Sequence, residues 1–126
     1  PLTGGFSSII FLVMNIRAIA DKIGMDYEGV MEDFCGDVGA VREKLLAFAS
    51  GNIAESIDGC LGSGDYAGAK KLAHSLRKNA EKLGIRKLAE QAGRIEEVND
   101  EKMQADWHEA KELYTSIINA IKGVAE

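Results

Sequence analysis

The chain has 126 residues, which is enough for one domain with a hydrophobic core and too short for two comfortable ones. Its net charge of -5, with no long run of lysines and arginines, excludes the usual nucleic-acid-binding surface. The two cysteines, Cys35 and Cys60, form no CxxC pair and are too few to staple a secreted scaffold, so we expect core or half-buried cysteines in a cytoplasmic protein. The only proline is Pro1, and helix-forming residues dominate, so the composition favours an all-α protein.

An apolar segment opens the chain, from about Phe6 to Ile23. Its most hydrophobic stretch, residues 8–14, is far shorter than the ~20 apolar residues that cross a bilayer, so we expect no membrane insertion. The segment then adopts a helical spacing in Ile16, Ile19, Ala20 and Ile23. We interpret residues 1–24 as an N-terminal helix that either packs on the remainder of the protein or forms a homodimer surface.

Turn signals and a second periodic pattern follow. Gly24 is expected to end the first helix, and Asp26 to cap a short one. After the punctuation at Gly36-Asp37, an amphipathic stripe predicts one long helix. This stripe consists of Val38, Val41, Leu45, Phe48, Ala49, Asn52, Ile53, Ser56, Ile57 and Cys60.

Three further predicted helices complete the chain. Asp65 is a good N-cap for a helix that runs to about Leu83, where Gly84 supplies the left-handed terminal position. The next helix continues to a polar turn at Asn99-Asp100, and the last presents one apolar side. The apolar positions are Ile85, Leu88, Ala89, Ala92, Ile95 and Val98, then Met103, Trp107, Ala110, Leu113, Tyr114, Ile117, Ile118 and Ile121. Long amphipathic helices joined by short turns predict an antiparallel up-down four-helix bundle over residues 25–126, with one or two additional N-terminal helices.

His74 is the candidate functional residue. Residues three and four apart share a helix face, so Lys70, Arg77 and Lys78 are expected beside it, while the apolar stripe of the same helix points elsewhere. A neutral imidazole flanked by cations suits nucleophilic attack on a phosphoryl group. The simpler interpretation is an ordinary surface histidine on a solvated, charged face that Glu81 helps to stabilise.

The remaining polar clusters carry weaker signals. His108 lies in an acidic stretch and is interpreted as a surface residue, and Trp107 and Tyr114 as core residues. The acidic residues at 96–97 and 100–101 lie at a helix boundary, where carboxylates are usually solvated, so we predict no metal site there.

The sequence around the histidine resembles the histidine-containing phosphotransfer (HPt) domain of multistep two-component phosphorelays. The family pattern is approximately Ala-His-x-Leu-Lys-Gly, then small residues, then Leu-Gly. The matching residues here are Ala73, His74, Leu76, Arg77, Ala80, Leu83 and Gly84. The similarity extends to Gly36-Asp37, to Gly64-Asp65 and to the helix from Leu88 to Glu97, and it covers roughly residues 23–124.

The resemblance implies that His74 accepts a phosphoryl group from an aspartyl phosphate on a response-regulator receiver domain and passes it to another receiver. It implies an HPt-like bundle with no kinase activity and no bound cofactor, the Mg²⁺ coming with the receiver. A hybrid sensor kinase is a candidate parent chain.

Phosphate-stabilising roles are expected for Arg77, whose fork can hold two phosphate oxygens, and for Lys78 and Lys70. Lys78 stands where the family usually has glycine, so its side chain either contacts phosphate or crowds the partner. Two alternatives stay open: a helical adaptor that binds receivers without chemistry, and the phosphoacceptor domain of a chemotaxis-type kinase.

Overall fold

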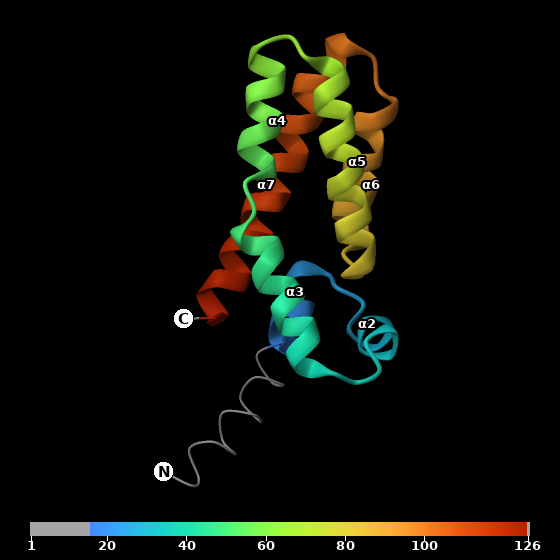
Figure 1. Ribbon diagram of the computed structural model, residues 1–126, viewed down its shortest axis with the longest axis vertical. Coiled ribbons are helices and arrows are strands. Elements are labelled where there is room, and N and C mark those ends of the chain that lie inside the picture. The colour runs from blue at the N-terminus through green and yellow to red at the C-terminus, as the bar shows by residue number, and fades with distance from the viewer. Residues whose placement is uncertain (1–15, 126) are drawn as a thin grey trace, which may run out of the picture.

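A computed structural model describes residues 16–125, although not the side chains of the last two, and helices joined by short turns make up this part of the chain (Figure 1). A helix at residues 16–23 is followed by α2 (Tyr27–Asp33), α3 (Val38–Ser50), α4 (Ile53–Gly62), α5 (Tyr66–Lys82), α6 (Arg86–Glu97) and α7 (Asp100–Ala125). The β structure in the described residues amounts to an isolated bridge between Met25 and Ile85. The all-α prediction is confirmed.

Three aspartates cap the N-terminal ends of α2, α3 and α5, as helix-capping rules predict. Each carboxylate accepts a hydrogen bond from the backbone N–H of the third residue along. The pairs are Asp26 with Gly29 at 3.2 Å, Asp37 with Ala40 at 3.1 Å and Asp65 with Gly68 at 2.9 Å. Past the end of α5, Gly84 has φ +64°, the left-handed conformation that the sequence predicts there.

The prediction of one long helix over residues 38–60 is wrong. Gly51 has the extended angles φ -71° and ψ 159°, which end α3, and the carbonyl of Asn52 then accepts from the N–H of Ser56 to begin α4. The apolar stripe continues across the break, with Leu45 and Ile57 buried on either side. Periodicity alone therefore hides the interruption.

The helices pack mainly on their neighbours in sequence. The most extensive contacts join α5 to α6, and α5 also packs on α4 while α7 packs on both α6 and α3. At 26 residues, α7 runs alongside the other helices, and α2 and α3 lie beyond the C-terminal end of α5 (Figure 1).

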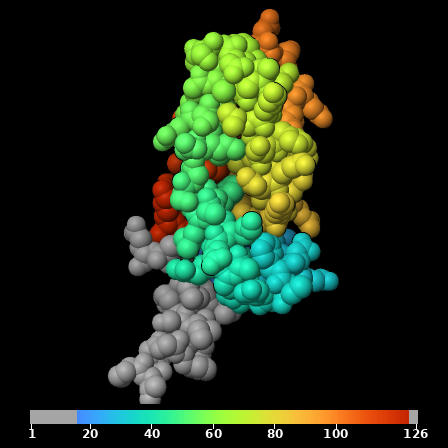
Figure 2. Space-filling model, in the orientation of Figure 1, coloured from blue at the N-terminus to red at the C-terminus, as the bar shows by residue number. Residues whose placement is uncertain are grey.

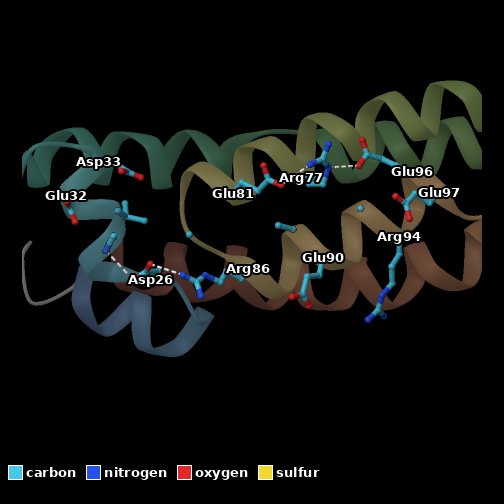
Figure 3. A pocket seen from close by; sticks show the side chains of 15 residues that line it. Asp26, Glu32, Asp33, Arg77, Glu81, Arg86, Glu90, Arg94, Glu96 and Glu97 are labelled. Carbon is cyan, nitrogen blue, oxygen red and sulfur yellow. Dashed lines mark hydrogen bonds and ion pairs between the residues drawn. The ribbon is translucent and has the colours of Figure 1, made fainter.

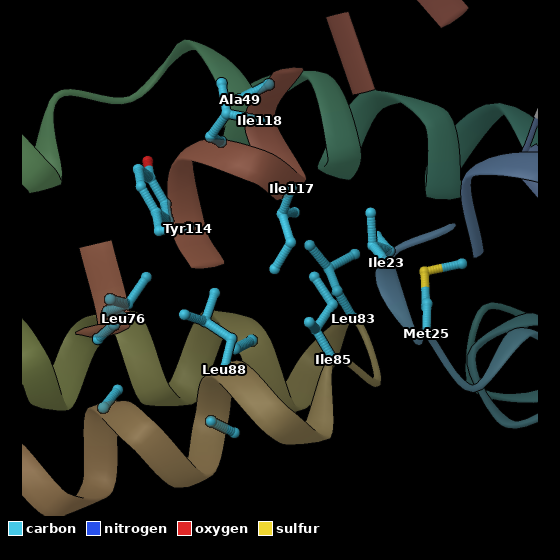
Figure 4. Close-up of a cluster of buried hydrophobic side chains, with 14 of the residues drawn as sticks. Ile23, Met25, Ala49, Leu76, Leu83, Ile85, Leu88, Tyr114, Ile117 and Ile118 are labelled. Atoms are coloured by element: carbon cyan, nitrogen blue, oxygen red, sulfur yellow. The ribbon is translucent and has the colours of Figure 1, made fainter. Parts of the chain in front are cut away.

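The core joins the N-terminal helix to the C-terminal end of α5 and the N-terminal end of α6. Ile23 and Met25 lie beside Leu83 and Ile85 in the apolar cluster (Figure 4). Ile16, Ile19, Ala20 and Ile23 are all buried, as their helical spacing predicts. The earlier part of the predicted N-terminal helix lies outside the described residues, and the homodimer surface stays a prediction.

Trp107 illustrates how the large side chains of α7 are accommodated. It is 3% exposed, and its Nε1–H donates to Oδ1 of Asp58 at 2.7 Å while Lys111 pairs with the other oxygen. Burial alone would raise the pKa of Asp58, but the hydrogen bonds from Lys111 and Trp107 hold that pKa below its usual range.

The two cysteines differ in their environment. Cys60 is half-buried as expected, whereas Cys35 is exposed, so the prediction is wrong for Cys35. Cys35 follows the last turn of α2 with φ 55°, a conformation that places it in a surface turn. Among the described helices, none is both long and apolar enough to span a membrane.

Candidate functional site

His74 lies on the outer face of α5. The small and apolar residues Ala73 and Leu76 on either side of it are fully buried, and they fix the rotation of the helix so that the imidazole points outward. The side chain of His74 is 46% exposed. A macromolecular partner therefore has direct access to part of the ring.

Glu96, from the last turn of α6, fixes the inner edge of that ring. One carboxylate oxygen is hydrogen-bonded to Nδ1 of His74, and the other accepts from Nε of Arg77 at 2.6 Å. The Glu96 side chain is only 19% exposed, because its neighbour Ile95 is fully buried and holds this turn against the core. Glu96 of α6 thus bridges His74 and Arg77, which both lie on α5.

Arg77 is held on several sides (Figure 3). Besides Glu96, its Nη1 donates to Glu81 on the same helix at 2.9 Å. Its Nη2 also lies 3.1 Å from Nδ1 of His74, a contact that is not a hydrogen bond when Nδ1 carries the proton. Its stem passes close to α6: a Cβ added to Gly93 would come within 3.3 Å of Cδ of Arg77. The hydrogen bond with Glu96, and then that with Glu81, raises the pKa of the guanidinium.

The charge state of Glu96 decides which histidine nitrogen carries the proton. Partial burial would raise the pKa of Glu96, but the hydrogen bonds from Arg77 and His74 outweigh it and lower that pKa. The carboxylate is therefore ionised at neutral pH and can only accept, so Nδ1 of His74 must be the donor. In this tautomer Nε2 has no proton, and its lone pair is free.

The other predicted site residues make no hydrogen bond or ion pair with the imidazole in the described part of the chain. Lys78 is exposed and Lys70 half-buried, and within the described chain neither forms an ion pair or a side-chain hydrogen bond. His108 is exposed on α7, where it pairs with Glu112 at 3.3 Å. Of the three predicted phosphate-stabilising residues, Arg77 alone has a polar atom within hydrogen-bond distance of His74 among the described residues.

Glu96 was not predicted as a site residue, since the acids at residues 96–97 were expected to be solvated at a helix boundary. Cations were expected near His74, whereas the structure places a carboxylate at the ring. The available signal was the position of Glu96 directly after the apolar Ile95 at the end of a strongly amphipathic helix.

An open groove of 1030 Å³ adjoins the site between α2, α5 and α6 (Figure 3). Its lining is mixed in charge, and it includes Arg77 and Glu96 as well as the Arg86–Asp26 ion pair at 3.2 Å. In the described part of the chain, no group of three or more histidine, cysteine, aspartate and glutamate side chains is placed to hold a metal ion. What the arrangement offers chemically is a half-exposed nucleophile backed by an ionised carboxylate.

Comparison with protein-family models, with curated proteins and with solved structures found no match for this chain.

Proposed function

We propose that this protein is a histidine phosphotransfer module of two-component signalling, in which His74 takes a phosphoryl group from an aspartyl phosphate of a receiver domain and passes it to another receiver. The observation that carries the proposal is the hydrogen bond between Glu96 and Nδ1 of His74. It leaves the unprotonated Nε2 as the reactive nitrogen of a half-exposed ring. The sequence around His74 supports the proposal by its resemblance to HPt domains.

On the acceptor side, the proposed reaction needs only the side chains of His74 and Glu96. The lone pair on Nε2 of His74 attacks phosphorus in line, the P–O bond to the aspartate breaks, and the aspartate carboxylate leaves with the bonding electrons. The ring keeps its proton on Nδ1 and becomes positively charged, and the ionised Glu96 stabilises that charge. Return transfer breaks the N–P bond and restores the neutral ring.

Under this proposal the cations have separate roles. Arg77 is a positioning residue, since it holds Glu96 through Nε and leaves only Nη2 close to the ring. Lys78, exposed one turn from His74, supplies a mobile ammonium for the phosphate oxygens, with Lys70 as a second. Mg²⁺ belongs to the receiver.

The helical packing supports the same proposal. We propose that α3 with α4, α5, α6 and α7 form an HPt-like up-down four-helix bundle, to which the helix at residues 16–23 and α2 are added. The support is that α4 packs on α5, α5 on α6 and α6 on α7, and that short turns join these helices.

A panel of receiver domains from the source genome, each preloaded with labelled acetyl phosphate and Mg²⁺, tests the function. We expect at least one receiver to transfer label to the wild-type protein at an acid-labile, alkali-stable position, and no transfer to His74→Gln. Absence of transfer from every receiver would refute phosphotransfer. Receiver binding that persists in His74→Ala without any transfer in the wild type would instead establish the adaptor alternative.

A further inference from the structure

Glu81 is bonded to Arg77 from a position that helix stability does not explain. It lies in the last turn of α5, one residue before the helix ends at Lys82, on a helix that lies at the surface of the molecule (Figure 2). A carboxylate there is close to the negative end of the helix dipole, which is unfavourable. An ion pair in which the cation precedes the acid by four residues is also the weaker order. The position of Glu81 therefore points to a role toward Arg77.

The two carboxylates that hold Arg77 differ in how firmly they hold it. Arg77 lies between Glu96 of α6 and Glu81 of its own helix (Figure 3). Glu96 accepts from Nε at 2.6 Å and its side chain is 19% exposed, whereas Glu81 accepts from Nη1 at 2.9 Å and its side chain is 52% exposed. Water weakens the more exposed pair. Glu81 is therefore the contact that Arg77 gives up first when its guanidinium turns.

Arg77 also keeps one donor group beside the imidazole without an acceptor. With the proton on Nδ1 of His74, Nη2 of Arg77 faces another N–H group at 3.1 Å, so the two nitrogens form no hydrogen bond. Among the described residues, the acceptors of Arg77 are Glu96 at Nε and Glu81 at Nη1. A guanidinium donor without an acceptor beside a nucleophile suits an anion bound to that ring.

This donor does not reach a phosphoryl group on His74 in the observed arrangement. Nη2 lies beside Nδ1, whereas the phosphoryl group is proposed on Nε2, at the other side of the ring. The stem of Arg77 passes against Gly93 of α6, where an added Cβ would come within 3.3 Å of Cδ, so the stem has little room to move toward α6. Arg77 therefore redirects its Nη atoms by turning the guanidinium, which breaks the hydrogen bond from Nη1 to Glu81.

We propose that Glu81 is a positioning residue for phosphotransfer: by holding Nη1 of Arg77, it keeps the guanidinium off the phosphoryl group on His74, which therefore remains easy to pass on. The proposal rests on the proposed function and deepens it by stating what limits the retention of the phosphoryl group. The transfer step itself makes and breaks the same bonds with or without Glu81. The balance between the phosphorylated receiver and the phosphorylated histidine is what changes.

Glu81→Gln tests this balance, because it keeps the size of the side chain and removes its charge. Arg77 then exchanges a neutral hydrogen bond, instead of a charged one, for the phosphoryl oxygens, and the exposure of Glu81 reduces the difference. With the receiver that labels wild-type His74 fastest, we expect the transfer equilibrium to move about threefold toward the phosphorylated histidine. Glu97→Gln removes the same charge at the exposed neighbour of Glu96 and should leave the equilibrium unchanged.

A second measurement tests the contact without any receiver. Phosphoramidate, a small donor, phosphorylates the protein, and the ³¹P NMR signal that is absent from His74→Gln is assigned to His74. A hydrogen bond from Arg77 favours the doubly ionised phosphoryl group, so Glu81→Gln should lower the pH at the midpoint of its titration. The same substitution in an Arg77→Gln background reports the effect of the Glu81 charge alone. We expect the midpoint to fall by about 0.5 pH more when Arg77 is present, which corresponds to the threefold change in the equilibrium.

The outcomes separate the two proposals. If a receiver labels His74 but Glu81→Gln changes the equilibrium no more than Glu97→Gln does, the role of Glu81 is refuted and phosphotransfer stands. An equally large change in the ³¹P titration without Arg77 would likewise refute a role through Arg77. If no receiver labels His74 but phosphoramidate does, and the titration depends on Arg77 as expected, phosphotransfer is refuted and the contact stands. If neither donor phosphorylates His74, both proposals are refuted.

Discussion

Glu96→Gln removes the negative charge of the Glu96 side chain and keeps its size and shape. The oxygen of the new amide is expected to accept from Nε of Arg77, which leaves the amide NH₂ facing Nδ1 of His74. Nδ1 must then accept rather than donate, so the proton moves to Nε2. The nitrogen that should attack phosphorus loses its free lone pair in most molecules.

The size of the effect follows from the hydrogen bond that is lost. A hydrogen bond to a charged group contributes about 1.5–3 kcal/mol and a neutral one about 0.5–1.5 kcal/mol, a difference of about 1–1.5 kcal/mol. Because the His74 side chain is 46% exposed, water weakens the interaction, and the lower end applies. About 1 kcal/mol corresponds to a roughly fivefold slower transfer to Glu96→Gln.

Two measurements check this prediction. Rapid-quench kinetics give the transfer rate, and ¹⁵N NMR of the imidazole reports which nitrogen is protonated. Glu97→Gln is the matched control, because Glu97 is the exposed neighbour of Glu96 on α6 and should leave both readings unchanged. Equal rates and an Nδ1-protonated ring in Glu96→Gln would refute the role assigned to the carboxylate.

Three substitutions away from His74 test the account of the fold by thermal or denaturant unfolding. Asp58→Ala leaves the buried Nε1–H of Trp107 without its acceptor and should lower the free energy of unfolding by about 1 kcal/mol, and Asp58→Asn should lower it less. Because folding lowers the pKa of Asp58, the stability that its carboxylate contributes is present above the unfolded pKa of about 4 and is lost as the pH falls below that value. Gly84→Ala combines φ +64° with a Cβ 2.9 Å from a methyl carbon of α2 and should cost roughly 2 kcal/mol, whereas Gly123→Ala, in open space, should not destabilise. Cys35→Gly removes the strain of φ 55° and should stabilise by up to about 1 kcal/mol; a loss of stability would mean that the turn is not strained.

Much of the helical pattern could be predicted because local rules decide it. Asp26 and Asp65 cap their helices through their own side chains, and Gly84 ends α5 by a conformation that other residues adopt at a cost. These effects act over three or four residues, so the sequence contains them directly. The break at Gly51 could not be predicted because the apolar stripe continues through it. Periodicity indicates which face of a helix is buried and contains no information on the backbone angles.

Only part of the site around His74 could be predicted from the sequence, and the reason differs from that for the fold. The outward face of His74 follows from the spacing of apolar residues on one helix. The contact with Glu96 depends on how α5 and α6 are rotated and shifted relative to each other, which neither helix encodes alone. The same holds for Arg77, which sequence reasoning placed beside His74 and assigned to phosphate, whereas in the structure two carboxylates already hold its guanidinium.

The most direct test of the central claim is the identity of the phosphorylated atom. NMR of the ¹⁵N-histidine-labelled protein, after transfer from a phosphorylated receiver, distinguishes a phosphoryl group on Nε2 from one on Nδ1. The geometry of His74 and Glu96 predicts phosphorylation at Nε2 of His74, with the proton kept on Nδ1. Phosphorylation at Nδ1, at His108 or at a residue other than histidine would contradict it.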